Sequence, residues 1–385
     1  MNLAPGTPDA RMLPLKGIRV VEVAQNLAGP YCAQILAHLG ADVIKVERPE
    51  GGDDTRGWGP PFLDGAGSSF HAVNLGKRSA AVDLKDPAAL ARLLALIDGA
   101  DVLVQNLRPG SMEALGLDQA ALLARNPKLI YCSLGALGSV GPLKDRPGFE
   151  PMVQAFSGLM MMSGQEGGPP IRMGTQVLDH GTGMWAAIGV LAALLRRAAT
   201  GRGGTVDTSL FETALGWWTI FYAGYALSGE VPQRHPTGSG KLIVFQGFET
   251  RTGPIVIAAG NDRLFAKLAV ALGRADWAQD PRFARNAGRY EHRAEILAEV
   301  ARIVATRSKG EWLDILEAAG VPCAPVNTLP EMLAEPQTEA VGMLMPVPGL
   351  DLRLMGLPVM LDGKRPPIAR RAPKLGEHSR ETLGD

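Results

Sequence analysis

The chain has 385 residues, of which 46% are hydrophobic and 20% charged, as in folded globular proteins large enough for more than one domain. Its 39 basic and 39 acidic residues cancel, so the overall charge favours neither nucleic acid nor an anionic membrane as a partner. Three widely spaced cysteines suit neither a disulfide framework nor a zinc site, and no apolar run reaches the ~20 residues of a membrane span, so we expect a cytoplasmic protein that binds no membrane.

Strand and helix patterns alternate over the first 135 residues. Helical patterns separate short runs rich in Val, Ile and Leu, which predict strands at 17–24, 41–47, 78–84, 101–106 and 129–134. Such runs are typical of strands buried on both faces of a parallel sheet. The order predicts an α/β fold with a doubly wound, Rossmann-like sheet that binds ligands at the carboxyl ends of its strands.

The sequence changes character in the second half. A strand pattern at 204–210 and a buried helix or connector at 217–227 precede a Pro/Gly loop at 230–241. Strand patterns at 242–250 and 253–260 and helices near 262–272 and 292–306 then predict a smaller α+β domain. We expect four parts, namely a large domain at 1–205, a linker at 206–229, the small domain at 230–325, and a return segment at 326–385 that completes the large domain.

Asp179 stands immediately before an almost wholly apolar helix, which we expect from about His180 to Arg197. Aspartate is a good N-cap residue, because its oxygen accepts a hydrogen bond from the first turn and its charge suits the helix dipole. A lone charge beside so much apolar sequence is nevertheless rare without a partner or a chemical purpose. Residue type alone favours the cap and leaves a catalytic role open.

The turn after the first strand, "AQNLAGP", argues against a dinucleotide site. It contains one glycine, Gly29, where the G-x-G-x-x-G fingerprint needs three, and Pro30 removes a backbone donor from the helix start. The nucleophile-elbow, H-E-x-x-H and phosphate-loop motifs are absent too. An NAD-linked oxidoreductase is therefore disfavoured.

Motifs spread over nearly the whole chain carry a family resemblance. They include "AGPYCAQILAHLGADVIKVERPEGGDDTRGW" near the start, "DRPGFEPMVQAFSGLM" and "LDHGTGMWAAIGVLAALLRRAATGRGG" in the middle, and "APKLGEHSRETL" at the end. With these motifs the chain resembles the class III CoA-transferases. This CaiB/BaiF family includes formyl-CoA transferase and the α-methylacyl-CoA racemases.

The resemblance implies that CoA passes from an acyl-CoA donor, with succinyl-CoA preferred, to a carboxylic acid. In the transferases an aspartate at this helix start, here Asp179, attacks the thioester, and an aspartyl anhydride and an aspartyl-CoA thioester follow. A carboxylate is a weak nucleophile, so this role would explain the apolar surroundings of Asp179. Coenzyme A and acyl-CoA would then be substrates, with no tightly bound cofactor or metal, and two chains would form an interlocked homodimer.

The resemblance also implies roles for other positions. Glu150, which also suits a surface or capping acid, matches a glutamate beside the transferase site. Gly238 and Gly240 occupy the place of a glycine-rich loop that closes over the reacting centre. Positions that match CoA contacts are Asn26, Leu27, Ala28, Arg48, Val82, Lys85, Asn106, Leu107 and Arg108. Of these, Lys85 and Arg108 also suit plain surface charges.

Phe149 separates the transferase interpretation from the racemase one. Racemases carry a histidine at this position, and phenylalanine cannot move a proton. A transferase with Phe149 in its substrate pocket is therefore favoured, and an α-methylacyl-CoA racemase or another acyl-CoA enzyme of the same fold remains the alternative. Ala114 and Pro147 stand where formyl-CoA transferase has cationic CoA contacts, so two such contacts are in doubt.

Overall fold

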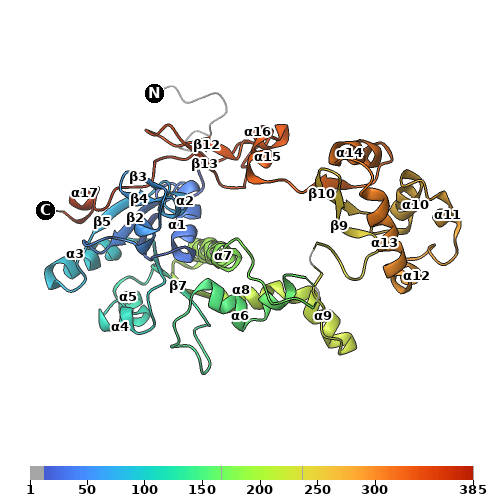
Figure 1. The fold of residues 1–385 in the computed structure, drawn as a ribbon. Coiled ribbons are helices and arrows are strands. Elements are labelled where there is room, and N and C mark those ends of the chain that lie inside the picture. Colours follow the sequence, from blue (N-terminus) through green and yellow to red (C-terminus); the bar gives the residue numbers. More distant parts are fainter. Residues whose placement is uncertain (1–12, 166, 236, 385) are drawn as a thin grey trace. The chain divides into compact units, whose positions relative to one another are not determined.

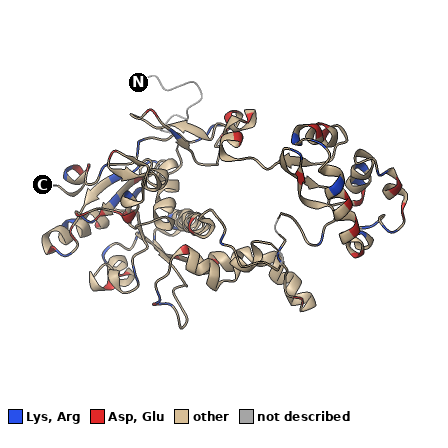
Figure 2. Cartoon of the chain, in the orientation of Figure 1, with Lys and Arg blue, Asp and Glu red and all other residues tan. Residues whose placement is uncertain are grey.

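A computed structural model describes residues 13–384 with the exception of 166 and 236. The chain divides into two compact units, and each is described by itself. In the described part of the chain, the large unit contains residues 13–159, 172–223 and 336–384, and the small unit contains residues 160–171 and 224–335. Acidic and basic residues are interspersed along the elements of both units (Figure 2).

The large unit is built on a parallel sheet of six strands in the order β5-β2-β1-β6-β7-β8. Figure 1 labels three of these strands, β2, β5 and β7. The strands are β1 (Arg19–Val23), β2 (Asp42–Glu47), β5 (Arg78–Ala81), β6 (Val102–Gln105), β7 (Ile130–Gly135) and β8 (Gly204–Ser209). All six overlap the stretches where the sequence predicts strands, and only β7 extends past its stretch, by one residue, so the α/β fold with a parallel sheet is confirmed. The strand order changes direction at β1, which places the crevice for ligands beside the carboxyl end of that strand.

Helices cover both faces of this sheet, which explains its continuous apolar runs. Val20 packs with helices α1 (Ala28–His38) and α7 (Val177–Thr200), whereas its neighbour Val21 packs with α3 (Pro87–Asp98). Successive side chains of a strand point to opposite faces, so both sets are buried. The C-terminal segment rejoins the sheet edge, where the Ala81 N–H donates to Ser379 Oγ at 2.9 Å.

The other elements of the large unit are short or peripheral. They are η2 (Asp54–Gly57), β3 (Phe62–Leu63), β4 (Ala66–Gly67), α2 (Ser68–Val73), α4 (Ser111–Ala114), α5 (Gln119–Arg125), α6 (Glu150–Phe156), α8 (Leu210–Trp217), α16 (Pro336–Ala340), β12 (Leu344–Pro346), β13 (Arg353–Met355) and α17 (Ser379–Leu383). Two more elements span the borders between the units, η3 (Leu159–Met162) and α9 (Thr219–Ser228).

The small unit has its own core. Its antiparallel sheet has the order β11-β10-β9, and an aromatic group that includes Phe265, Trp277 and Phe283 is buried with it. The strands are β9 (Phe245–Thr250), β10 (Gly253–Ala258) and β11 (Cys323–Pro325), and the helices are α10 (Asp262–Ala271), α11 (Ala275–Gln279), α12 (Asn286–Glu291), α13 (Arg293–Val304), α14 (Lys309–Ala318) and α15 (Leu329–Ala334). Sequence analysis missed α14, although Ser308 and Glu311 form a capping box at its start.

Some segments differ from what the apolar patterns indicate. Within residues 206–229, which the sequence assigns to a linker, β8 continues to Ser209 and is followed by α8 and α9. Residues 217–227 were expected as a buried helix or a connector; helix α9 forms there, but it has no buried residue, and Ile220 is 82% exposed. Helix α7 extends to 24 residues and is long and apolar enough to cross a bilayer. Because α7 packs against α1, β7 and β8, and core helices pass the same test, this is weak evidence for a span.

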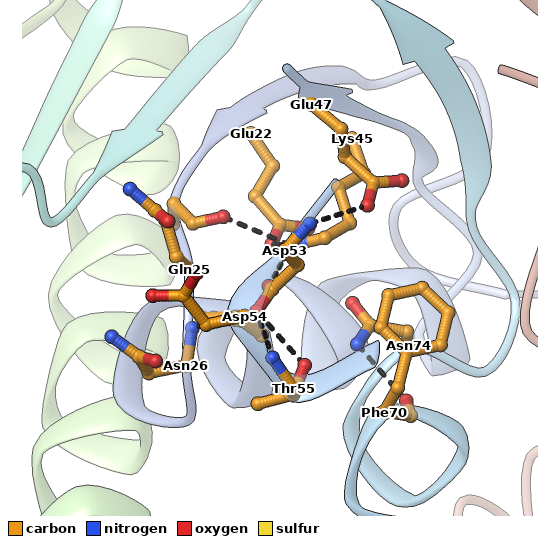
Figure 3. Close-up of polar contacts among 12 residues, drawn as sticks. Glu22, Gln25, Asn26, Lys45, Glu47, Asp53, Asp54, Thr55, Phe70 and Asn74 are labelled. Carbon is orange, nitrogen blue, oxygen red and sulfur yellow. Dashed lines mark hydrogen bonds and ion pairs between the residues drawn. The ribbon is translucent and has the colours of Figure 1, made fainter. Parts of the chain in front are cut away.

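A buried cluster of charges lies between the sheet and the loop after β2 (Figure 3). Lys45 Nζ lies 2.9 Å from Glu22 Oε1 and 2.8 Å from Asp53 Oδ2, and all three side chains are shielded from solvent. Lys77 Nζ contacts the second oxygen of Glu22 at 2.7 Å. Burial lowers the pKa of Lys45, but the nearby Asp53 and Glu22 more than offset this effect, so its pKa is raised and Lys45 stays charged.

We predict that Lys45→Met lowers the free energy of unfolding by about 3–5 kcal/mol, because it leaves the buried Asp53 without its counter-ion and Glu22 with Lys77 alone. Urea unfolding followed by far-UV circular dichroism measures this change. Arg125→Met removes an exposed pair with Asp98 and should change stability little. Equal effects of the two substitutions would contradict the prediction.

Candidate active site

A cavity of about 1090 Å³ opens in the large unit at the carboxyl ends of its strands. Its walls come from the turn after β1, the ends of β6 and β7, and the starts of α6 and α7. This is the place where parallel α/β sheets bind ligands, because the loops after several strands meet there. All lining residues belong to the large unit.

The turn after β1 is fixed by two side chains from other segments. Asp53 Oδ1 accepts a hydrogen bond from the Asn26 N–H at 3.1 Å, and Asp53 is itself held by Lys45 (Figure 3). Asn106, after β6, accepts from the Gln25 N–H at 2.8 Å and donates to the Gln25 carbonyl at 2.7 Å. These bonds hold Asn26 in a left-handed conformation with φ of 63°. Its buried Oδ1 atom has no hydrogen-bond partner among the described residues.

The first turn of α7 lies next to the first turn of α1 because Gly183 allows close contact. A Cβ atom on Gly183 would lie 2.7 Å from the Ala28 carbonyl oxygen and 3.1 Å from the Cys32 nitrogen. Residues four apart share a face of a helix, so Asp179 and Gly183 both face this contact. The close packing brings Asp179 into the cavity beside the turn after β1.

Asp179 is not the N-cap of its helix. Helix α7 begins at Val177, Gln176 is the N-cap residue, and Asp179 is the third residue of the first turn. The helix begins earlier than expected because Leu178 is fully buried in the core, so packing and not cap preference sets its start. No hydrogen-bond partner for the Asp179 carboxylate occurs among the described residues, so the start of α7 stabilises its charge through the helix dipole and not through a cap bond.

Two neighbours and partial burial determine the electrostatics of Asp179. Burial and the negative charge of Glu150 raise its pKa from 3.8 to about 7, while Arg172 acts in the opposite direction. Glu150 is buried at the first position of α6, where it accepts a hydrogen bond from Gln154 Nε2. Arg172 Nε donates to Glu150 Oε2 at 3.3 Å. A carboxylate with a pKa near neutrality inside a cavity is a typical feature of a catalytic site.

The structure brings together most of the residues that the sequence singled out. Those that line the cavity are Asn26, Leu27, Ala28, Arg48, Asn106, Leu107, Arg108, Phe149, Glu150 and Asp179. Pro147, one of the two departures from the formyl-CoA transferase pattern, also lines it, whereas Ala114 does not. Arg48 is paired with Asp54 on the cavity wall.

Val82 and Lys85 do not line this cavity. Val82 is 2% exposed and packs in the core beneath α3, and Lys85 is exposed in the turn after β5. Gly238 and Gly240 belong to the small unit. There, a Cβ atom would collide with the Phe245 carbonyl oxygen at Gly238 and with the His235 ring at Gly240, so this loop requires glycine at both positions.

Sequence reasoning missed several residues of the cavity, among them Trp58, Tyr131, Arg172 and Asp207. Trp58 ends a motif that was already noted for the family resemblance. Arg172 lies in an irregular segment before α7, where no periodicity indicates which way a side chain faces. Only the fold reveals that it meets Glu150.

We predict that Asp179→Asn raises the melting temperature above pH 7. The folded state keeps a proton on Asp179 that the unfolded state releases from about pH 4 upwards, so ionisation opposes folding. This destabilisation is absent below about pH 4 and complete above about pH 7. An asparagine at position 179 does not ionise, so the variant lacks the destabilisation. Differential scanning fluorimetry from pH 4 to 8.5 measures the difference.

Asp262→Asn serves as the control for that experiment. A hydrogen bond from Arg289 lowers the pKa of Asp262, so its ionised form stabilises the folded state, and this substitution should lower the melting temperature at neutral pH. A difference between Asp179→Asn and the wild type that does not change with pH would contradict the raised pKa of Asp179.

Comparisons with known proteins identify the family. Residues 15–379 match the family model described as CoA-transferase family III. The chain is 36% identical over 390 residues to the succinate–glutarate CoA-transferase of Agrobacterium fabrum, covering 97% of this chain and 96% of that protein. It is 35% identical over 382 residues to the succinyl-CoA:glutarate CoA-transferase of Mus musculus, covering 97% and 86%.

A solved structure agrees with these relatives. The crystal structure of a CaiB/BaiF family protein from Brucella suis superposes with a TM-score of 0.87 at 37% identity, covering 98% of this chain and all of that one. The whole fold, and not a local motif, is therefore shared. Because residues 15–379 match the family model and the whole fold is shared, the chain belongs to CoA-transferase family III.

Proposed function

We propose that this CoA-transferase moves CoA from an acyl-CoA, with succinyl-CoA as the favoured donor, to a carboxylic acid, and that Asp179 is its nucleophile. The observation that carries this proposal is a half-buried carboxylate without a hydrogen-bond partner among the described residues, inside the large unit's cavity and with a pKa of about 7. A purely structural acid at a helix start would be exposed or paired. The names of the Agrobacterium and mouse relatives support succinyl-CoA and a carboxylic acid as the substrates.

The reaction proceeds in steps, and in each step one bond to a carbonyl carbon forms while another breaks. The Asp179 carboxylate attacks the thioester carbonyl, which forms a mixed anhydride and releases the CoA thiolate. The thiolate attacks the aspartyl carbonyl of the anhydride, which forms an aspartyl-CoA thioester and releases the donor acid. The acceptor carboxylate then attacks this thioester, which forms a second mixed anhydride and releases the CoA thiolate. The thiolate attacks the acceptor's carbonyl in this anhydride, which forms the new acyl-CoA and restores the Asp179 carboxylate.

Several groups in the cavity suit these steps. Partial burial removes water from the Asp179 carboxylate and makes it more nucleophilic, and a pKa of about 7 leaves a large ionised fraction near neutral pH. Backbone N–H groups at the start of α7 can stabilise the oxyanion that develops on the attacked carbonyl. Glu150 keeps the pKa of Asp179 high, and the side chain of Arg172 partly balances the two negative charges.

The rest of the cavity suits the CoA portion of the donor. The turn at residues 25–28 presents backbone groups at the start of α1, and the basic side chains on the wall suit phosphate groups, namely Arg48, Arg108, Lys144 and Arg146. Val82 and Lys85 are outside the lining of this cavity, so their CoA role rests on the family resemblance alone. The family resemblance supports Gly238 and Gly240 as parts of a mobile lid.

A homodimer in the cytoplasm is also part of the proposal. The large unit carries an apolar groove of about 1180 Å³ between α1 and α7, lined by residues that include Ile35 and Ile188. Helix α9 exposes further apolar side chains, such as Ile220 and Leu227. Apolar surface of this extent favours contact with another protein. Together with the family resemblance, it supports a second copy of the chain as the partner.

Phe149 supports a transferase over the racemase alternative. It lies in the cavity wall, is 61% exposed, and precedes Glu150 at the start of α6. A racemase needs a proton donor and a proton acceptor on opposite sides of the acyl α-carbon, and phenylalanine can be neither. The neighbouring Glu150 is already engaged by Arg172 and Gln154.

We predict that Asp179→Asn lowers CoA transfer by at least about a thousandfold, because the variant keeps the shape of the side chain but lacks the attacking carboxylate. The assay combines succinyl-CoA with a panel of carboxylic acids and detects new acyl-CoA species by mass spectrometry. Titration calorimetry with CoA should give nearly the same affinity for variant and wild type. An active variant, with deamidation excluded, would show that Asp179 is not the nucleophile.

A further inference from the structure

Arg172 carries positive charge into the cavity next to Asp179. It lies in the segment before α7, its side chain is 39% exposed, and its guanidinium contributes to the pKa of Asp179. One edge of the guanidinium is used, since Nε donates to Glu150 Oε2 at 3.3 Å. The terminal nitrogens, Nη1 and Nη2, have no hydrogen-bond partner among the described residues. An arginine has five N–H donors, and a free edge of this kind binds a carboxylate through two parallel hydrogen bonds.

The other cations of the cavity are placed differently. Arg48 is tied to Asp54 and to the Glu50 carbonyl, and the charges of Arg108, Lys144 and Arg146 do not contribute to the pKa of Asp179. Of the basic side chains in this cavity, Arg172 is therefore the one that acts at the reacting end. The remaining cations are left for the phosphate groups of CoA.

The positions of Arg172 and Asp179 in the cavity limit what the free edge of the guanidinium can bind. The two side chains form no ion pair within 4.0 Å in the described part of the chain, although each lies within the electrostatic reach of the other. The reacting carbonyl carbon must approach an Asp179 oxygen to about 3–3.5 Å. A group that Arg172 holds while Asp179 attacks is thus a different part of the same acyl chain.

We propose that Arg172 binds the distal carboxylate of the acyl group, so that the enzyme selects dicarboxylic over monocarboxylic substrates. This inference rests on the proposed CoA transfer and adds the residue that sets its substrate class. The buried Glu150 holds the guanidinium in place through Nε, and the opposite edge receives the substrate. Both the donor's acyl group and the acceptor acid use the same edge in turn, because each occupies the reacting position at a different step.

The test compares substrates that differ only in the distal carboxylate. Transfer from succinyl-CoA to glutarate is measured beside transfer from butyryl-CoA to valerate, whose chains have the same numbers of carbon atoms. Arg172→Gln should lower kcat/KM for the dicarboxylic pair by about 10- to 100-fold, the range expected for a lost charge-assisted bidentate contact. The monocarboxylic pair should lose clearly less, because it loses only the effect of the guanidinium on the charge of Asp179. Arg172→Lys, which keeps the charge, should retain part of the preference.

Arg48→Gln is the matched control, because it removes another cation of the same cavity that is paired with Asp54 and does not contact Glu150. As a proposed phosphate contact, Arg48 should affect both substrate pairs to a similar extent. A binding measurement tests the same contact without turnover. Arg172→Gln should raise the Kd of glutarate for the CoA-bound enzyme at least tenfold and leave the Kd of CoA unchanged. Equal losses for both substrate pairs, or an unchanged glutarate Kd, would overturn the assignment of Arg172. Absence of transfer by the wild-type enzyme with every pair would overturn the proposed function itself.

Discussion

The close approach of α7 to α1 at Gly183 determines where the chemistry of this protein can take place. Any side chain larger than hydrogen at this position would meet the backbone of α1 and separate the two helices. With glycine there, the first turn of α7 lies beside the turn after β1, at the carboxyl end of a central strand. The carboxylate that we propose as nucleophile and the backbone that we propose as CoA site therefore share one cavity wall.

Two groups of charges near this wall are compensated to different degrees. Lys45, Lys77, Glu22 and Asp53 are buried with every charge paired, and the cluster fixes the turn at Asn26 through one hydrogen bond from the Asn26 N–H. Asp179 has no such partner among the residues that the structure describes, and Glu150 adds a like charge to its partial burial. The paired cluster thus supplies a rigid support, and the unpaired carboxylate keeps the reactivity that pairing would remove.

The sequence predicted the sheet well, because its strands are buried on both faces and their Val- and Ile-rich runs are hard to mistake. It predicted the cavity through the family resemblance, but that resemblance also assigned Val82 and Lys85, which burial and position keep out of the lining. The start of α7 was misplaced because burial of Leu178, and not a cap preference, decides it. Arg172 and the Lys45–Glu22 pair, 23 residues apart, could not be found from local patterns, since only the fold brings their partners together.

Trapping the covalent intermediate is the most direct test of the central claim that Asp179 carries the transferred group. Wild-type enzyme is incubated with succinyl-CoA alone and then treated with hydroxylamine, which converts an aspartyl anhydride or thioester into a stable hydroxamate. Peptide mapping by mass spectrometry should place this modification on Asp179 and nowhere else, and omission of succinyl-CoA should abolish it. A modification on another residue, or none at all in enzyme that transfers CoA under the same conditions, would contradict the account.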